Sequence, residues 1–186
     1  MGICVVSFSS RAGGNCSQIG KLICSSCKDS QLFDFSSFTV HPCGECGYEC
    51  FSAPEKCPWS ADMERRLLDE ILRSDLAYFI LPNYCDYPCA NFFIFNERSQ
   101  CFFQGRPDLL DAYEKVPKRA VVVSNTNEEN FRQALAYQAY EKPDILFLPA
   151  KEYGKDSIKG DLLTNEKPSA TLSPSFRNNN QKRSRA

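Results

Sequence analysis

The sequence has one histidine, His41, and no apolar run near the roughly 20 residues that a membrane-spanning helix needs. Nucleophilic sites of the Cys–His or Ser–His–Asp type would all depend on this one residue, which lies in a loop beside Pro42. The net charge is −1, so no overall field favours nucleic acid or a membrane surface. We therefore expect neither kind of partner.

The chain also lacks the pattern of a secretory signal, because its first apolar run, residues 3–6, is short and follows no basic region. Cysteine, in contrast, is abundant, with 11 among 186 residues. An odd number of cysteines without an export signal favours reduced thiols, a subset of them binding metal, over disulfides. We expect a cytoplasmic protein with one domain.

Short apolar runs typical of buried strands alternate with stretches of helical apolar spacing. Strands are predicted at residues 3–6, 31–35, 76–81, 119–124 and 145–148. Helices are predicted up to Cys27, from an N-cap at Ser60, over residues 89–101 and from an N-cap at Asn127 to about Gln138. This alternation predicts βαβ units and a parallel sheet covered on both faces.

Three prolines set further expectations. Pro82 should end the third strand, with residues 83–88 as a loop. The tail, residues 164–186, is polar and basic, and Pro168 and Pro174 argue against a helix there. We expect a folded domain over residues 1–163 and a disordered tail.

The loop at residues 8–17 joins the first predicted strand to the first predicted helix. The first amides of a helix have no intrahelical partners, and the helix dipole adds to their attraction for a phosphate. Glycines let the backbone approach a ligand, serine and asparagine side chains can donate, and one arginine supplies charge. The candidate phosphate-binding residues are Ser9, Arg11, Gly13, Gly14, Asn15, Cys16 and Ser17. An ordinary βα turn is the alternative.

The string from Phe8 to Cys16 (FSSRAGGNC) resembles the phosphate loop G-S-x-R-x-x-G-N-T of the NADPH-dependent FMN reductase-like branch of the flavodoxin superfamily. Phe8 replaces a glycine, and Cys16 replaces the threonine hydroxyl. The segment from Leu81 to Arg98 is similar to that family's S-P-V-Y-x-G-x5-L-K-x-F-x-D-R pattern. The resemblance implies a flavodoxin-like three-layer α/β/α sandwich with a five-stranded parallel sheet.

The resemblance also implies FMN as the cofactor and NAD(P)H as the electron donor. In doubly wound sheets, ligands lie beyond the carboxyl ends of the strands where the strand order reverses, so both matched loops should meet there. The residues expected against the isoalloxazine ring are Pro82, Asn83, Tyr84 and Cys85, with Ser124 in a third loop.

Four cysteines in the loop at residues 41–59 follow the spacing C-x2-C-x3-C-x6-C-P. They are Cys43, Cys46, Cys50 and Cys57, and four thiolates within so short a span can surround one metal site. The stretch resembles the [4Fe-4S] motif of iron-sulfur flavoproteins and also a cysteine segment of FMN reductases that need not carry a cluster. One extra residue separates its second and third cysteines, so zinc or a loop of reduced thiols stay open as alternatives.

The function that the resemblance implies is FMN-dependent oxidoreduction, in which NAD(P)H reduces a flavin, quinone or similar small-molecule acceptor. A homodimer or homotetramer is the implied assembly. One alternative is an iron-sulfur flavoprotein that carries electrons from ferredoxin. Another is a non-catalytic redox sensor that responds through its thiols or a metal.

Overall fold

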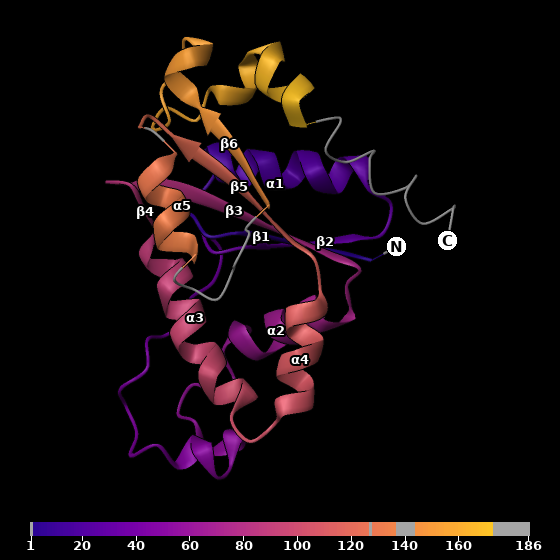
Figure 1. Cartoon of the computed structure of the whole chain (residues 1–186), viewed down its shortest axis with the longest axis vertical. Coiled ribbons are helices and arrows are strands. Elements are labelled where there is room, and N and C mark those ends of the chain that lie inside the picture. Colours follow the sequence, from indigo (N-terminus) through magenta and orange to yellow (C-terminus); the bar gives the residue numbers. More distant parts are fainter. Residues whose placement is uncertain (1, 127, 137–143, 173–186) are drawn as a thin grey trace.

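A computed structural model describes residues 2–126, 128–136 and 144–172, and its centre is a twisted parallel sheet (Figure 1). The strands lie in the order β2-β1-β3-β5-β6. Their bounds are β1 Ile3–Ser7, β2 Ser30–Asp34, β3 Leu76–Tyr84, β5 Lys118–Ser124 and β6 Asp144–Pro149. The order reverses beside β1, as in flavodoxin-like folds. The predicted five-stranded parallel sheet is therefore confirmed.

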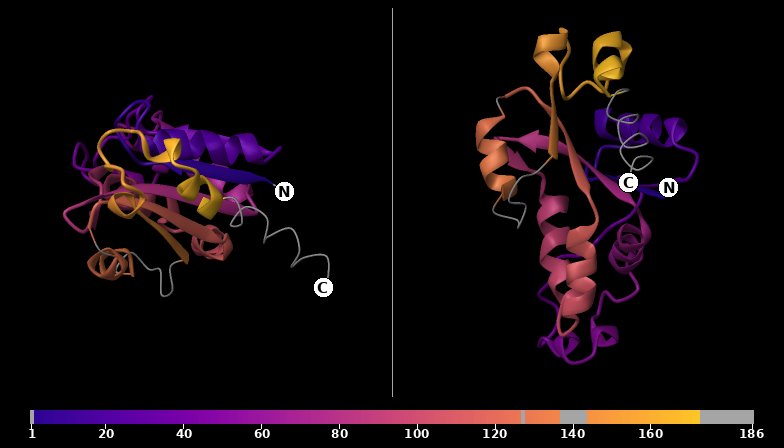
Figure 2. Two further views of the ribbon diagram at one scale, coloured as in Figure 1. Left: turned by 90° about the horizontal axis from the view of Figure 1, so that it is seen from above. Right: turned by 45° about the vertical axis from the view of Figure 1, so that its right-hand side comes forward.

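Alternate residues of β1 point to opposite faces of the sheet and enter two separate cores. Cys4 and Val6 join a core beneath the helices of one face, while Ile3 and Val5 join the core of the other. α1 (Asn15–Ser26) covers the second face together with the short helix at residues 166–172, and the other α-helices cover the first (Figure 2). They are α2 Met63–Arg73, α3 Ala90–Phe103, α4 Pro107–Lys115 and α5 Glu129–Ala136. This is the predicted three-layer arrangement.

α3 and α4 extend beyond the sheet and carry the cysteine loop, residues 41–59, at the far end of the molecule (Figure 1). Two short 3-10 turns lie in this loop, at Glu49–Phe51 and Pro54–Lys56. The prediction had no helix at α4, which begins with Pro107 in its first turn, where the missing N–H costs no hydrogen bond. No helix among the described residues is long and apolar enough to cross a membrane.

The third strand does not end at Pro82, contrary to the prediction. β3 continues to Tyr84 and turns into β4 (Tyr87–Pro88) through a two-residue hairpin. Cys85 and Asp86 both have positive φ angles, 51° and 66°, as the favoured two-residue hairpin turns require. Pairing with β4 keeps residues 83 and 84 in an extended conformation beyond Pro82.

The N-cap of α2 is Asp62, not Ser60. Its carboxylate accepts a hydrogen bond from the backbone N–H of Glu64 at 3.1 Å. Both residue types are good caps, and local spacing alone did not distinguish them. The predicted cap at Asn127 and the helix end at Gln138 lie outside the described residues.

The expected boundary at residue 163 lies too early. Residues 166–172 form a helix, with the Asn165 side chain accepting the N–H of Lys167 at 2.9 Å. Pro168 falls in the first turn, where an N–H has no intrahelical partner to lose. Leu172 is fully buried in the same core as Ile19 of α1, so the packed domain reaches at least this residue. Residues 173–186 lie outside the description.

Candidate functional site

The loop after β1 is bonded directly to the start of α3. The Asn91 side-chain amide donates to the Phe8 carbonyl at 2.8 Å and to the Ser10 hydroxyl at 2.9 Å. The Cys89 thiol donates to the same Phe8 carbonyl at 3.2 Å. The Phe8 ring is fully buried and packs 5.1 Å from the Phe35 ring. The first two loops predicted to share a site are therefore held together.

Inside this loop, short bonds fold the backbone around a small turn. The Ser9 hydroxyl accepts the N–H of Arg11, and the Arg11 carbonyl accepts the N–H of Gly14 and the Ser17 hydroxyl. Gly13 has a φ of +67°, which a side chain would strain. Among the described residues, the N–H groups of residues 12 and 13 have no hydrogen-bond partner. With the first amides of α1, they form a set of backbone donors within one short loop.

The side chains of Asn15 and Arg11 bond to the chain itself. Asn15 is buried; its amide donates to the Ser157 carbonyl at 3.0 Å, and its oxygen accepts the Leu162 N–H at 2.9 Å. The Arg11 guanidinium donates to the Ile158 carbonyl. In this structure, the two side chains therefore hold the segment from Ser157 to Leu162 against the first loop. Their predicted role as phosphate donors stays a prediction.

Cys16, also expected at the phosphate, is buried against the core of α1. Burial raises the pKa of its thiol far above the usual range, with charge on Cys89 adding to the shift. Its Sγ is therefore a weak neutral donor at neutral pH.

The second loop contacts the third through Asn83. Its amide nitrogen donates to the Ser124 hydroxyl at 2.8 Å and to the Thr126 hydroxyl at 2.9 Å. Its oxygen is buried and has no hydrogen-bond partner among the described residues. Thr126 in turn donates to Asp86 at 2.5 Å, and this bond lowers the pKa of the Asp86 carboxyl. An unpartnered buried acceptor is therefore held at the carboxyl ends of β3 and β5.

Tyr84 lies in the hairpin between these loops, with 58% of its surface exposed. Burial of the remainder raises the pKa of its hydroxyl; Cys89 and Cys16 add to the shift, and Arg11 opposes it. Because β3 is paired with β1, the hairpin and the first loop leave the sheet at the same edge. Pro82 is buried, and Cys85 is exposed at the tip of the hairpin.

A further link closes the loops into a ring. Asn125, directly after β5, donates to the Asp156 carboxylate at 3.2 Å and accepts the N–H of Ser157 at 3.2 Å. Ser157 is the residue that Asn15 binds. The four loops at the carboxyl edge of the sheet are therefore joined in a circle, around the point where the strand order reverses.

Sequence reasoning missed two contributors to this ring, Asn91 and residues 156–162. Asn91 had a usable signal, because it is a polar residue in the first turn of a helix that follows a predicted loop at this edge. Residues 156–162 had no such signal in the sequence, because they lie several residues beyond the last predicted strand. Their contact with the start of α1 is visible only in the folded structure.

A cavity of about 460 Å³ opens beside the ring of loops. Ser10 and Asn91 form one wall, and residues 35–40 after β2 form the other. The volume lies within the usual range for small-molecule sites, about 300–1,000 Å³. The lining combines aromatic rings with hydroxyl and amide groups and contains no charged side chain.

The four cysteines predicted to bind metal are not assembled into a metal site. Cys50 is buried and donates its thiol hydrogen to Cys101 of α3 at 3.3 Å, while Cys43, Cys46 and Cys57 are partly exposed. Among the described residues, no group of three or more His, Cys, Asp or Glu side chains is placed to hold a metal. The predicted metal ligation by these four cysteines therefore stays a prediction. The partner of Cys50 comes from a helix 51 residues away, which loop spacing does not reveal.

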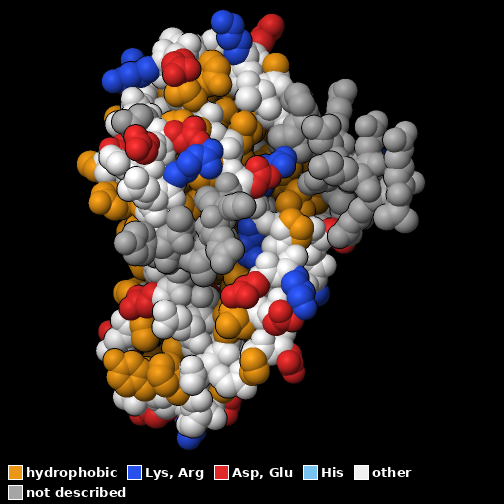
Figure 3. Space-filling model, in the orientation of Figure 1, with side chains coloured by type: hydrophobic (Ala, Val, Ile, Leu, Met, Phe, Trp, Pro, Cys, Tyr) orange, Lys and Arg blue, Asp and Glu red, His pale blue; other side chains and the backbone are white. Residues whose placement is uncertain are grey.

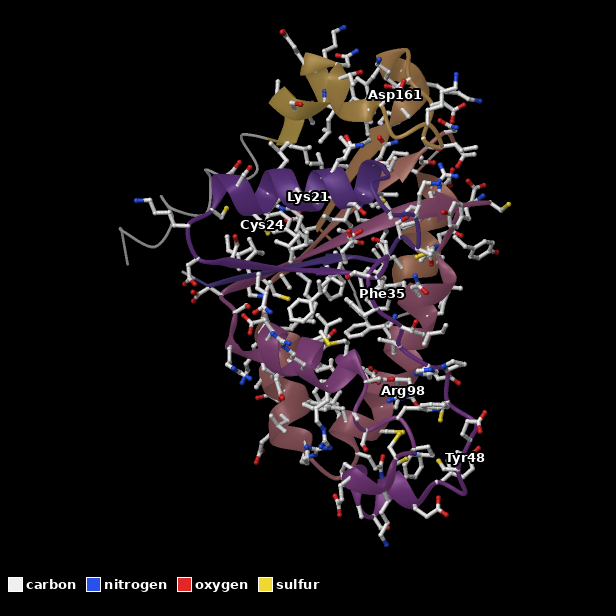
Figure 4. All side chains as sticks on the ribbon, turned by 180° about the vertical axis from the view of Figure 1, so that it is seen from behind. Lys21, Cys24, Phe35, Tyr48, Arg98 and Asp161 are labelled. Atoms are coloured by element: carbon white, nitrogen blue, oxygen red, sulfur yellow. The ribbon has the colours of Figure 1, made fainter. Side chains whose placement is uncertain are left out.

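Arg98 of α3 holds both ends of the cysteine loop. Its guanidinium donates to the carbonyls of His41 at 2.7 Å and Trp59 at 3.3 Å, and the rings of these two residues stack 3.8 Å apart. Arg98 also lies 3.0 Å from Asp62 and 3.2 Å from Glu64. Figure 4 shows sulfur atoms between the labelled Arg98 and Tyr48, at this same end.

Glu64 is almost fully buried in this cluster. Burial raises the pKa of its carboxyl to about 8, although Arg98 acts in the opposite direction. One guanidinium faces two carboxylates, so a proton on Glu64 leaves the cluster with Asp62 as the single counter-charge.

Comparison with known proteins confirms the fold. No protein-family model and no curated protein matches the sequence. Among solved structures, Smu.1420 from Streptococcus mutans UA159 has a TM-score of 0.61 at 15% identity, over 96% of this chain and 100% of its own. The Trp repressor binding protein from Bacillus subtilis has a TM-score of 0.58 at 14% identity, covering 94% and 96%.

FerB from Paracoccus denitrificans, a flavoenzyme NAD(P)H:(acceptor) oxidoreductase, has a TM-score of 0.58 at 14% identity, over 94% of this chain and 92% of its own. Identities this low make the likeness one of fold. The flavodoxin-like architecture expected from the two loop motifs is therefore correct.

Proposed function

We propose that this chain is an FMN-dependent oxidoreductase that takes electrons from NAD(P)H and passes them to a small acceptor such as a quinone or a flavin. The observation that carries the proposal is the closed ring of four loops at the carboxyl edge, which holds the unpaired amides of the first loop and the β3–β4 hairpin at the same edge of the sheet. The fold neighbour FerB, a flavoenzyme that uses NAD(P)H, supports it.

The residues of this edge fit FMN by their chemistry. The amides at residues 12 and 13 and the first turn of α1 suit a phosphate dianion, and the positive φ of Gly13 leaves the turn open. The buried oxygen of Asn83 lacks a donor, and an isoalloxazine ring carries an N–H on its polar edge. FMN, when bound, supplies the exchange of a hydride with NAD(P)H and of electrons with the acceptor.

In this scheme, the side chains of the protein bind FMN and orient it. Asn83 fixes the polar edge of the ring, held in place by Ser124 and Thr126. Tyr84 would lie against the ring, and burial raises the pKa of its hydroxyl further above the neutral range. The ring of loop-to-loop bonds keeps the amides and the hairpin at a fixed separation, so the ligand meets a preformed site.

The cavity beside Ser10 and Asn91 offers room for the acceptor. Its uncharged lining of aromatic and hydroxyl groups suits a planar neutral molecule such as a quinone. No iron-sulfur cluster belongs to the proposal, because the described cysteines form no group of ligands.

The direct test is to incubate the purified protein with FMN, remove free flavin and record the visible spectrum, followed by steady-state oxidation of NADH and of NADPH with a soluble benzoquinone. We expect one FMN per chain and acceptor-dependent oxidation of at least one nucleotide. Flavin binding without nucleotide oxidation, together with reduction by ferredoxin, would move the assignment to an electron carrier. Failure to bind flavin at all would overturn it.

A further inference from the structure

Two buried thiols from distant parts of the chain touch at the end of the molecule opposite the ring of loops. Cys50 lies in the 3-10 turn Glu49–Phe51 and is 1% exposed, and Cys101 lies in the last turns of α3 and is 9% exposed. Their sulfur atoms are 3.3 Å apart. Neither residue has a role in the proposed flavin site.

We propose that Cys50 and Cys101 form a redox-active dithiol that a low-molecular-weight disulfide, such as oxidised glutathione, converts to an intramolecular disulfide. An exposed loop cysteine, Cys46 or Cys57, attacks the small disulfide, releases one reduced thiol and forms a mixed disulfide. Cys50 attacks the sulfur of that loop cysteine and releases the other reduced thiol, and Cys101 then attacks Cys50 and restores the loop thiol. The protein loses two protons and two electrons, and the small disulfide gains both.

The geometry requires little movement for this bond. A disulfide has an S–S length of about 2.0 Å, so the two sulfur atoms must approach by roughly 1.3 Å. Arg98 fixes both ends of the loop that contains Cys50, at His41 and at Trp59. Between these two residues the chain forms two short 3-10 turns and no strand or α-helix. Such a loop can make this adjustment while α3 stays in place.

Access comes from the neighbouring thiols. Cys46 and Cys57 are partly exposed, and both lie close enough to Cys50 to influence its ionisation. A small disulfide can react first at either of them, and exchange then transfers the bond inward to the buried pair. Figure 3 shows hydrophobic side chains gathered at this end of the surface, where Tyr48 and Phe51 of the same loop are exposed.

The dithiol is a site separate from the ring of loops. Cys101 follows Ala90, the first residue of α3, by 11 positions. At 1.5 Å per residue this places it about 17 Å along the helix from the end that Asn91 attaches to the first loop. The inference therefore does not depend on the proposed flavin chemistry.

The test is to titrate the folded protein with oxidised glutathione, block the remaining thiols with iodoacetamide and map the cysteines by peptide mass spectrometry. We expect an intact mass lower by two hydrogen atoms, a peptide pair joined through Cys50 and Cys101, and full reversal by dithiothreitol. The cross-linked protein should also melt at a higher temperature than the reduced form, because the bond ties the cysteine loop to α3.

Matched variants keep the result interpretable. Cys101→Ser and Cys101→Ala should both stop at a glutathione adduct or a disulfide within the cysteine loop, with no bond between the loop and α3. Cys24→Ser, which removes a partly exposed thiol of α1, should form the cross-link as the natural chain does. A dominant bond between other cysteines would overturn the proposal. So would a Cys50–Cys101 bond that forms only after unfolding in urea, or a native chain that yields only mixed disulfides.

Discussion

The two ends of α3 lie in regions that differ in their side-chain chemistry. At its first turn, Asn91 and Cys89 bond to the loop after β1 and help to close a ring of loops at the edge of the sheet. At its last turns, Cys101 touches Cys50 in a long irregular loop that lies away from the sheet. The first end is built from amides and hydroxyls, and the second from thiols around a buried arginine.

The difference lies in what fixes each region. The ring of loops occupies a place that every doubly wound sheet creates, where neighbouring loops diverge, so its position follows from the topology. The cysteine loop has no such scaffold, and its anchor is the Arg98 cluster with His41, Trp59, Asp62 and Glu64. Changes at one end of α3 should therefore leave the other end intact.

The largest expected effect follows from removing the arginine that anchors the cysteine loop. Arg98→Met leaves the buried Asp62 carboxylate without its cation and should lower the free energy of unfolding by about 3–5 kcal/mol. Urea denaturation measures this change in the free energy of unfolding. The control Arg132→Met removes an exposed ion pair with Glu128 and should stay within about 0.5 kcal/mol of the natural chain. Equal losses in both variants would contradict the anchoring role.

The next effect concerns the other end of the helix. Asn91→Ala removes the donor to the Phe8 carbonyl and should cost about 1–3 kcal/mol in the free energy of unfolding. It should also weaken FMN binding, measured by flavin fluorescence, while the Cys50–Cys101 oxidation proceeds unchanged. Asn96→Ala is the matched control, since the Asn96 amide nitrogen has no hydrogen-bond partner among the described residues. If the control weakened FMN binding as much, the link would be unimportant.

A smaller effect is the dependence of stability on pH. The pKa of Glu64 rises from 4.5 to about 8 on folding, so the folded state binds a proton that the unfolded state releases. Its contribution to stability is complete below pH 4.5 and is lost as the pH rises through about 8. The slope should reach at most about 1.4 kcal/mol per pH unit. Glu64→Gln should flatten the stability profile in this window, and the exposed Glu114→Gln should not.

The smallest expected effect is a difference in FMN binding between variants of two equally exposed tyrosines in the hairpin. Tyr84→Ala should weaken FMN binding by about 0.5–1.5 kcal/mol, the contribution of an aromatic contact, and shift the flavin spectrum. Tyr87 is 59% exposed, close to the 58% of Tyr84, so Tyr87→Ala controls for surface loss. Matching affinities and spectra in the two variants would place the flavin ring away from Tyr84.

Several features of the fold could be predicted because they depend on local patterns. The short apolar runs, such as residues 3–6, and the βα order of the segments led to the observed sheet. The helix within residues 166–172 was missed because Pro168 was treated as a helix breaker without a known position in the turn. A proline is harmful or neutral according to whether its missing N–H had a partner.

For the candidate site, the sequence alone determined which loops would meet, because parallel strands place their carboxyl ends at one edge of the sheet. It did not determine what each side chain contacts. Asn15 bonds to Ser157 and Leu162, and Cys50 pairs with Cys101, across separations of 142, 147 and 51 residues. Only the tertiary structure decided these contacts, because each one forms where distant segments pack, and motif spacing describes neighbours along the chain alone.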